Sequence, residues 1–427
     1  MKTVLTNCTV IDCTGKPPEK NMTVVIEGDK IAALQPGGHQ GAAGGKERVF
    51  DLEGGYVLPG LWNCHVHLGG LLPDPKHIQA RESAVENAIR AGRDAIDALR
   101  VGVTGLRVVG QRDGVDIAWR DAFNAGIFVG PRMFVCGKSI SATGGHGDLG
   151  RDDPTGRADG PYEMRKAVRE RLKRGVDQIK LCVSGGHAEV IAGAGEDEQA
   201  YLQSQLFLDE IQAATEVAHQ KGKRVCVHGG GEAMKVAIRG GVDCIEHGYL
   251  MDDETIELML ERDVYYDPTL VCNSDEQVML DDGDLDKFHK GRVLVIKSEK
   301  VTPKYAHIHK EGVQKAYKAG VKIVTGGDSV PSGMFTLWEL ENLVWAGMTE
   351  MDVLIAATRT SADLCGVVDE LGTVEEGKLA DLIVLTANPL DNIRNIHKLK
   401  HVFKGGKLVD IGEPEGLADF WELFFFD

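Results

Sequence analysis

The segment Tyr56-Val57-Leu58-Pro59-Gly60-Leu61-Trp62-Asn63-Cys64-His65-Val66-His67-Leu68 contains a short apolar run, a Pro-Gly break and two histidines that flank one valine. In an extended chain alternate residues project to the same face, so we expect His65 and His67 to lie together. Two adjacent imidazoles at a strand end can supply two ligands to a borderline-soft divalent ion such as Zn²⁺. They could also be ordinary histidines of a polar strand end, so the pair alone does not decide between these readings.

Ligand-type side chains recur near the ends of later apolar runs. Lys180 lies within the fourth run, His228 and His247 lie in the fifth and sixth, and Asp328 follows the eighth. Singly, a strand-end histidine can be a hydrogen-bonded structural residue, and an aspartate after Gly-Gly can cap a turn or a helix. A lysine inside an apolar strand is unusual, because an unpaired buried ammonium is costly unless it is paired or chemically changed. Together, in chain order, these residues predict a metal site.

The central part of the chain, residues 57–365, alternates strand-type and helix-type segments, which predicts a parallel sheet. Helical patterns occur, for example, at residues 78–99, 161–174 and 208–221. Eight such units predict an α/β protein with a (β/α)8 TIM barrel, whose active site lies at the carboxyl ends of the strands. A doubly wound sheet is the alternative, but no G-x-G-x-x-G turn follows the first strand. The strand candidates are residues 57–66, 104–109, 132–137, 178–183, 224–229, 244–248, 264–270 and 322–328.

The two ends of the chain have a different texture. Residues 1–56 and 366–412 contain short runs of alternating apolar and polar residues separated by turn residues, which predicts antiparallel strands. Neither piece is large enough to bury a core alone, so we expect the two to combine into one small β-sandwich. Residues 413–427 form an apolar tail that includes Phe420, Trp421 and Phe424. This tail is too apolar to be left in water, so it should pack on its own chain or on a neighbouring subunit. We expect a role in assembly.

The charge and cysteine content of the chain argue against some classes of partner and environment. The formal net charge of -17 argues against a nucleic-acid partner or an anionic membrane surface. The nine cysteines have no framework spacing, which suits reduced, buried thiols. The N-terminal residues run directly into a strand pattern without an apolar leader, and no run reaches the roughly 20 apolar residues of a membrane span. We therefore expect a cytoplasmic protein.

Several motifs resemble the amidohydrolase superfamily, and most of all its imidazolonepropionase-like branch. That branch includes Xaa-Pro dipeptidases, carboxypeptidase-like dipeptidases and ochratoxin-type amidases. The matching residues cover nearly the whole chain: the His65–His67 pair, Ala142-Thr143-Gly144-Gly145-His146-Gly147, Glu246-His247-Gly248 and Gly372-Thr373-Val374-Glu375-Glu376-Gly377-Lys378-Leu379-Ala380-Asp381. These motifs are specific to the superfamily rather than to one substrate.

The resemblance implies a centre with two divalent metal ions, for which we expect Zn²⁺. In the family the fourth-strand lysine is carboxylated by CO₂ and bridges the metals, and Lys180 matches it. An apolar setting should lower the pKa of this amine and free it to add CO₂. The members with one metal lack such a lysine, which favours the binuclear dipeptidase-like group. By the same resemblance, His65, His67 and Asp328 would hold one metal ion, and His228 and His247 the other.

The resemblance also implies a mechanism, in which a metal-bridging hydroxide attacks the amide carbonyl and Asp328 accepts its proton. His146 follows the third strand in a glycine-rich loop, where it could reach the oxyanion or a substrate carboxylate. His187 and Tyr266 are further candidates for substrate binding, with Tyr266 as a pocket wall that has a polar tip. Four other histidines lie in helical, charged stretches and are expected to face solvent: His219, His289, His307 and His309.

The expected function is hydrolysis of the amide bond of dipeptides or N-acyl amino acids, including ochratoxin-like aryl amides, by a homo-oligomer. A cyclic-amide hydrolase of the hydantoinase or imidazolonepropionase type would share the metals and differ in substrate. A catalytically idle scaffold is a third reading, but such proteins usually lose ligands, and here all six candidate ligands are present. The loops at residues 193–201 and 273–287 are long enough to cover a pocket.

Overall fold

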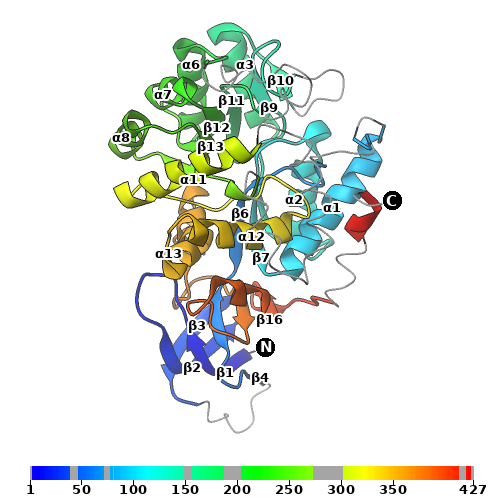
Figure 1. Ribbon diagram of the computed structural model, residues 1–427. Coiled ribbons are helices and arrows are strands. Elements are labelled where there is room, and N and C mark those ends of the chain that lie inside the picture. The colour runs from blue at the N-terminus through cyan, green and yellow to red at the C-terminus, as the bar shows by residue number, and fades with distance from the viewer. Residues whose placement is uncertain are drawn as a thin grey trace.

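The computed structural model describes residues 2–38, 47–71, 77–79, 81–148, 155–186, 203–272, 302–412 and 420–424. Figure 1 shows a barrel of strands and helices with a smaller β-layer unit beneath it. The N-terminus lies in the smaller unit, whereas the C-terminal turn lies beside helix α1 of the barrel (Figure 1). The α/β barrel predicted from the sequence is therefore confirmed.

The smaller unit contains strands from both ends of the chain. They form one eight-stranded sheet with the order β17-β16-β15-β5-β1-β2-β3, and β4 pairs with β1. Its buried side chains include Val24, Leu382 and Phe403, so the two ends share one core, as the sequence predicts. The bounds are β1 Lys2–Val10, β2 Glu19–Glu27, β3 Lys30–Pro36, β4 Glu47–Asp51, β5 Tyr56–Pro59, β15 Leu382–Leu385, β16 Leu399–Lys404 and β17 Lys407–Leu408.

The Pro-Gly break noted in the sequence divides the strand candidate at residues 57–66 into two strands. The chain breaks at Gly60 into β5, which pairs with β15, and β6 (Leu61–Val66), the first barrel strand. A side chain at Gly60 would collide with Thr104, because an added Cβ would lie 2.1 Å from Oγ1 of that residue. This glycine lets the chain pass from the small sheet into the barrel, so the metal-ligand strand starts at the junction of the two units.

The remaining barrel strands lie close to the predicted segments. The regular ladders form a three-stranded sheet, β6-β7-β8, and a six-stranded sheet, β10-β9-β11-β12-β13-β14. The short strands β9 and β10 were not predicted. The bounds are β7 Val103–Val108, β8 Arg132–Phe134, β9 Ser139–Ser141, β10 Thr155–Arg157, β11 Ile179–Cys182, β12 Val225–Gly230, β13 Cys244–Tyr249 and β14 Tyr265–Asp267.

The eighth segment, residues 322–328, joins the two sheets. The amide of Tyr266 on β14 donates to the carbonyl oxygen of Lys322 at 2.8 Å. The amide of Val324 donates to the carbonyl oxygen of Tyr266 at 2.9 Å. On its other side the carbonyl of Thr325 accepts from Cys64 of β6 at 2.6 Å. This segment therefore lies between the seventh and first strands, as the eighth strand of a barrel does.

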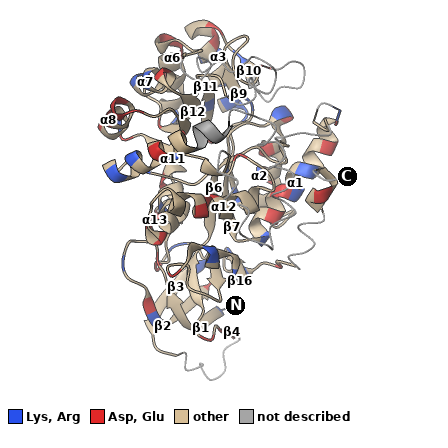
Figure 2. Cartoon of the chain, viewed as in Figure 1, with Lys and Arg blue, Asp and Glu red and all other residues tan. Residues whose placement is uncertain are grey.

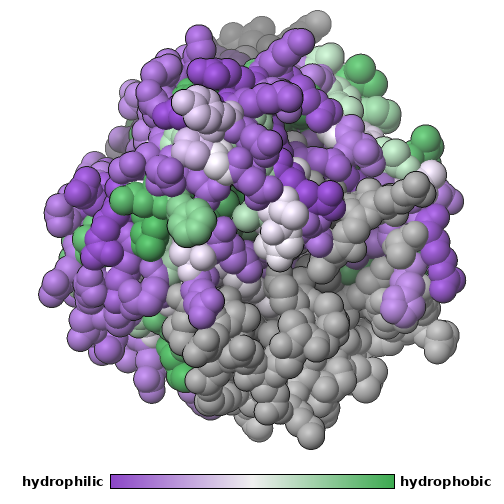
Figure 3. Space-filling model, turned by 90° about the horizontal axis from the view of Figure 1, so that it is seen from above, coloured by the Kyte–Doolittle hydropathy of each residue, from purple (hydrophilic) through white to green (hydrophobic). Residues whose placement is uncertain are grey.

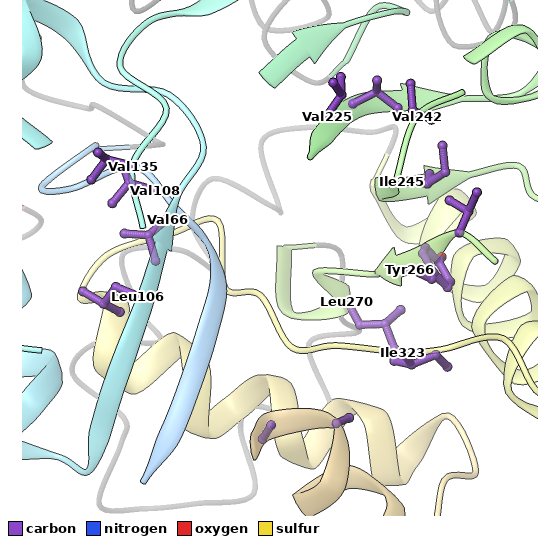
Figure 4. Close-up of a cluster of buried hydrophobic side chains, with 14 of the residues drawn as sticks. Val66, Leu106, Val108, Val135, Val225, Val242, Ile245, Tyr266, Leu270 and Ile323 are labelled. Atoms are coloured by element: carbon purple, nitrogen blue, oxygen red, sulfur yellow. The ribbon is translucent and has the colours of Figure 1, made fainter. Parts of the chain in front are cut away.

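Helices cover the outside of the barrel. Helix α1 begins with a capping box in which Ser83 and Glu86 satisfy each other's backbone amides. Buried apolar side chains from β6, β7, β12 and β13, among them Val66 and Ile245, lie in the cluster shown in Figure 4. The helix bounds are α1 Ala84–Arg100, α2 Val115–Asn124, α3 Gly160–Lys173, α6 Leu208–His219, α7 Glu232–Arg239, α8 Asp253–Arg262, α11 Thr302–Ala319, α12 Ser332–Trp345, α13 Glu350–Ile355 and α14 Ser361–Leu364.

The surface carries charges of both signs, which are distributed over the helices of the barrel (Figure 2). The face seen in Figure 3 is mostly hydrophilic, with hydrophobic residues in separate small patches. Among the described residues, no helix combines the length and the apolar character that a bilayer-spanning segment requires.

The barrel and the small sheet are tied by a salt bridge that one substitution can test. Asp381 is buried and accepts from Nε of Arg132 on β8 at 2.6 Å and from the amide of Gly405 at 2.7 Å. We expect Asp381→Ala to lower the free energy of unfolding by about 2 to 4 kcal/mol, because it leaves both donors without an acceptor. Urea unfolding measures this change. Glu27→Ala, at an exposed position of β2, is the control, and an equal effect of both substitutions would contradict the assignment.

Candidate metal centre and active site

Side chains from the first, sixth and eighth strands converge at the carboxyl ends of the barrel strands. Oδ1 of Asp328 lies 3.4 Å from Nε2 of His65 and 3.4 Å from Nε2 of His67. One potential ligand atom each from His65, His247 and Asp328 lies within 4.8 Å of the others. His247 thus lies close to His65 and Asp328, and its assignment to the other metal ion stays a prediction.

The orientation of three imidazoles follows one rule, in which Nδ1 is held by a partner outside the centre. Nδ1 of His65 lies 2.8 Å from Glu246, that of His67 lies 2.8 Å from the carbonyl oxygen of Gly110, and that of His247 lies 2.7 Å from the hydroxyl of Thr269. A hydrogen bond at one ring nitrogen fixes the direction of the other. Nε2 of each ring is therefore the nitrogen that is available to a metal ion.

His228 has the opposite arrangement. Its Nε2 lies 3.2 Å from the carbonyl oxygen of Gly185, which leaves Nδ1 for a ligand role. The ring of His146 stacks on that of His228 with centroids 3.8 Å apart and planes 5° apart. The amide of His146 donates to the side chain of Gln205 at 2.8 Å, which fixes the glycine-rich loop against the chain before α6. The structure therefore brings His146 into contact with a predicted metal ligand.

The buried imidazoles are neutral at neutral pH. Burial and, after it, the charge of Lys180 lower the pKa of His65 to about 4 against the opposing effects of Asp328 and Glu246. Burial, with neighbouring imidazoles, also lowers the pKa of His228 and His247 well below the usual value. A neutral imidazole is the form that binds a metal ion.

Lys180 is buried on β11, and among the described residues its Nζ has no hydrogen-bond partner. The expectation that the apolar strand lowers its pKa is wrong. Burial does lower it, but the carboxylate of Glu246 and the thiols of Cys226 and Cys182 outweigh burial, so the pKa lies above its usual value. A buried amine without an acceptor needs a partner, and a bound metal ion with a carboxylated amine would meet that need.

A buried ion pair that sequence reasoning missed lies beneath these ligands. Arg107 on β7 contacts the carboxylate of Glu246, and its Nε donates to the carbonyl oxygen of Cys64 at 2.6 Å. Its guanidinium also lies 3.5 Å from Asp267. Burial would raise the pKa of Glu246, but Arg107 and Lys180 hold it well below the usual value, so Glu246 remains an anion beside His65. The signal was available, because Arg107 is a charged residue inside an apolar run, as Lys180 is.

The backbone of His247 is held by two side chains. His247 has φ 65°, in the left-handed region, and its carbonyl oxygen lies 2.8 Å from the hydroxyl of Tyr266 and 2.6 Å from Nε2 of His309. The expectation that Tyr266 offers a polar tip to the pocket is not met, because this fully buried hydroxyl donates to His247. The expectation that His309 faces solvent is wrong, because its ring is buried and contacts the ring of Tyr249.

Of the remaining histidines discussed for the sequence, two are exposed and two lie outside the described residues. His219 is 44% exposed and lies 2.8 Å from Asp243, and His307 is exposed. His187, the third candidate for substrate binding, lies outside the described residues, as does His289. The two loops predicted to cover the pocket, at residues 193–201 and 273–287, also lie outside them.

Asp94 of α1 joins the loops that follow the first and eighth strands. Its buried carboxylate accepts from the amide of Gly69 at 3.0 Å, and from the amide and hydroxyl of Ser332 at 2.8 and 2.6 Å. Gly69 comes two residues after His67, and Ser332 comes four residues after Asp328. Burial raises the pKa of Asp94 to about 6, against the opposing effect of these hydrogen bonds.

Several known proteins with a similar sequence or structure are named as hydrolases. The profile described as the amidohydrolase family matches residues 56–409. The ochratoxinase of Aspergillus niger is 32% identical over 384 residues, which cover 82% of this chain and 75% of that protein. A crystal structure of a Xaa-Pro dipeptidase with bound methionine is 32% identical, with a TM-score of 0.82 over 96% of this chain and 100% of that one. A prolidase complexed with N-methylphosphonate-L-proline is 28% identical, with a TM-score of 0.82 and the same coverage.

The pKa of Asp94 leads to a test of pH dependence. Its folded pKa of about 6 lies above the unfolded value, so the folded protein binds this proton more readily. The contribution of Asp94 to the free energy of unfolding should therefore fall by about 2 to 3 kcal/mol as pH rises from 4 to 7.

Asp94→Asn should remove this contribution. The free energy of unfolding of the wild type, minus that of the variant, is expected to decrease from pH 4 to pH 7 and to be constant above it. Urea titrations at several pH values measure the difference, with Asp121→Asn as a control at a side chain that is 62% exposed. A constant difference over the whole pH range would show that folding does not raise the pKa of Asp94.

Proposed function

The chain belongs to the amidohydrolase family and is a hydrolase that acts on C–N bonds, and from this premise we propose that it cleaves dipeptides or N-acyl amino acids at a centre of two divalent metal ions. The observation that carries the proposal is the common orientation of His65, His67 and His247. Each has Nδ1 bound outside the centre and Nε2 free for a ligand role. Imidazoles that are merely structural would not need this arrangement at three separate strand ends.

The donor set fits divalent cations. His65, His67 and Asp328 lie on one side, His228 offers Nδ1, and His247 lies between them, with its ring centroid 4.7 Å from that of His65 and 4.6 Å from that of His228. Four neutral imidazoles and a carboxylate suit Zn²⁺. Bound cations would supply Lewis acidity toward the carbonyl and lower the pKa of water.

The amine of Lys180 is proposed to be the bridge between the two ions. The ammonium of Lys180 would first lose one proton; addition of CO₂ to the resulting amine would then form an Nζ–C bond and release a second proton to solvent, which gives a carbamate whose single negative charge is shared by two oxygens. This change would replace a buried donor that has no acceptor among the described residues with two acceptors for cations. Glu246 and Arg107 would then remain as the charge pair beneath the bridge.

Asp328 is the proposed proton carrier. Its carboxylate is 19% exposed, between two imidazoles, so it can contact both the centre and a substrate. It would accept a proton as water attacks the amide carbonyl, and would deliver that proton to the leaving nitrogen when the C–N bond breaks. His146 is half-buried over His228, where its ring could donate to the developing oxyanion or to a substrate carboxylate.

The substrate class rests on the similar proteins. A Xaa-Pro dipeptidase, a prolidase and an ochratoxinase are named for substrates in which an amide joins an acyl group to an amino acid. We infer a linear amide whose leaving group keeps its α-carboxylate. In the glycine-rich loop the amides of Gly144 and His146 already donate to Asp148 and Gln205, so the imidazole of His146 is the proposed partner of such an anion. The cyclic-amide reading shares the same centre, whereas an idle scaffold would not need the ligand orientation described above.

Metal binding tests the centre directly. Purified protein is expected to contain nearly two divalent ions per chain, and Lys180→Ala to lose most of the metal and the amide-hydrolase activity. A short-chain carboxylic acid in the medium should partly restore both, since it can replace the carbamate oxygens. Elemental analysis and hydrolysis assays measure the two quantities, with Lys166→Ala, at a side chain 77% exposed, as the control. Unaltered metal content in Lys180→Ala would refute the bridge.

A panel of N-acyl amino acids and dipeptides, each with a free and an amidated C-terminus, tests the substrate. We expect the free acids to be hydrolysed and the amidated forms to lose at least ~10-fold in kcat/KM, equivalent to about 1.4 kcal/mol of transition-state binding. Equal rates for both forms would remove the requirement for a carboxylate. Cleavage confined to cyclic amides would favour the hydantoinase-like alternative.

A further inference from the structure

The C-terminal aromatic turn, residues 420–424, packs on its own chain next to the candidate metal centre. Trp421 is completely buried in a small cluster with Leu71 and Val330. Leu71 comes four residues after His67, and Val330 comes two residues after Asp328. The tail therefore contacts the two loops that directly follow metal-ligand positions on the first and eighth strands.

Helix α1 holds the edges of this turn. The guanidinium of Arg93 lies over the ring of Phe420, 4.7 Å from its centroid, and that of Arg90 lies 5.7 Å from the centroid of Phe424. Both rings also contact Trp421, with centroids 5.0 and 5.6 Å away. Figure 1 shows the turn lying beside α1, and Figure 2 shows basic and acidic residues along that helix. Cation–π contacts of this kind fix the position of the turn on α1.

The same two loops are held from α1 by Asp94. Its carboxylate binds Gly69 and Ser332, while Trp421 covers Leu71 and Val330. One polar and one apolar contact thus join the two loops to each other. Asp328, at the start of the second loop, has φ 45°, which is unfavourable for a residue other than glycine, so this loop needs external contacts to keep its shape.

We propose that the C-terminal aromatic turn is a positioning element of the metal centre, which fixes His67 and Asp328 by packing Trp421 against Leu71 and Val330. The inference rests on the proposed function, since it concerns the same centre. It replaces the assembly role expected from the sequence, because the largest side chain of the tail is buried within its own chain. Loss of Trp421 should loosen the ligand loops and leave the subunit contacts unchanged.

The test compares Trp421→Ala with two matched variants in the metal-loaded, full-length protein. Leu423→Ala alters the same turn at a side chain that is 68% exposed. Trp421→Phe keeps an aromatic ring, and it should restore function because the indole nitrogen has no hydrogen-bond partner among the described residues. Val24→Ala, in the core of the small sheet, controls for a general loss of stability away from the centre.

The primary readout is the rate at which a chelator removes the metal, followed by the visible spectrum of the Co²⁺-substituted protein. We expect Trp421→Ala to release metal at least ~10-fold faster and to alter the Co²⁺ bands, which report ligand geometry. Trp421→Phe should remain within about 3-fold of the wild type, and Leu423→Ala and Val24→Ala should not differ from it. Light scattering should give the same mass for all variants.

Three outcomes would overturn the proposal. Metal release from Trp421→Ala at the wild-type rate would show that the turn does not position the ligands. An equally fast release from Val24→Ala would show that stability alone controls the rate. A reduced mass of Trp421→Ala with an unchanged spectrum would restore the assembly role and likewise overturn the proposal. A wild-type protein that binds no metal would instead refute the proposed function, so the two failures are distinguishable.

Discussion

The ion pair between Arg107 and Glu246 is the contact on which the candidate centre depends. Both side chains are buried in the barrel, where an unpaired charge is very unfavourable, so each needs the other. Glu246 has a second role, because its other oxygen binds Nδ1 of His65. A contact between the second and sixth strands thus fixes a ligand of the first strand. The orientation of the His65 ring therefore depends on a buried ion pair inside the barrel as well as on the position of its own strand.

The candidate ligands could be predicted from the sequence because their positions at strand ends follow from the local strand pattern. The alternation of a strand puts His65 and His67 on one face, and parallel strands bring His228, His247 and Asp328 to the same edge. Membership of the amidohydrolase family, which the motifs indicated, is confirmed. The fold followed from the same regularity. The Pro-Gly break was visible in the sequence, but the contact that requires glycine at position 60 was not, since Thr104 comes near only in the folded barrel.

The supporting contacts were missed because they join residues far apart in the sequence. Asp94 was part of a helical pattern, and nothing near it indicates that Gly69 and Ser332 will share its carboxylate. His309 was expected to face solvent because its neighbours are charged, yet the helix turns this one side chain toward His247. The pKa of Lys180 was misjudged for the same reason: an apolar strand predicts burial, whereas the nearby carboxylate of Glu246 comes from another strand.

Three residues at the strand ends have a left-handed backbone conformation, which lowers the stability of the fold. His247, Thr269 and Asp328 all have φ between 45° and 65°, a conformation that costs about 1 to 3 kcal/mol for a residue other than glycine. Each is compensated locally: the carbonyl oxygen of His247 has two side-chain partners, the hydroxyl of Thr269 lies against the ring of His247, and the amide of Asp328 donates to His65 at 2.9 Å. A net gain of about 1 kcal/mol per hydrogen bond offsets much of that cost. A fold selected for stability alone would place glycine at such positions. Residues with ligand side chains can occupy these positions because hydrogen bonds from neighbouring residues stabilise their backbone. This pattern is expected of a functional site.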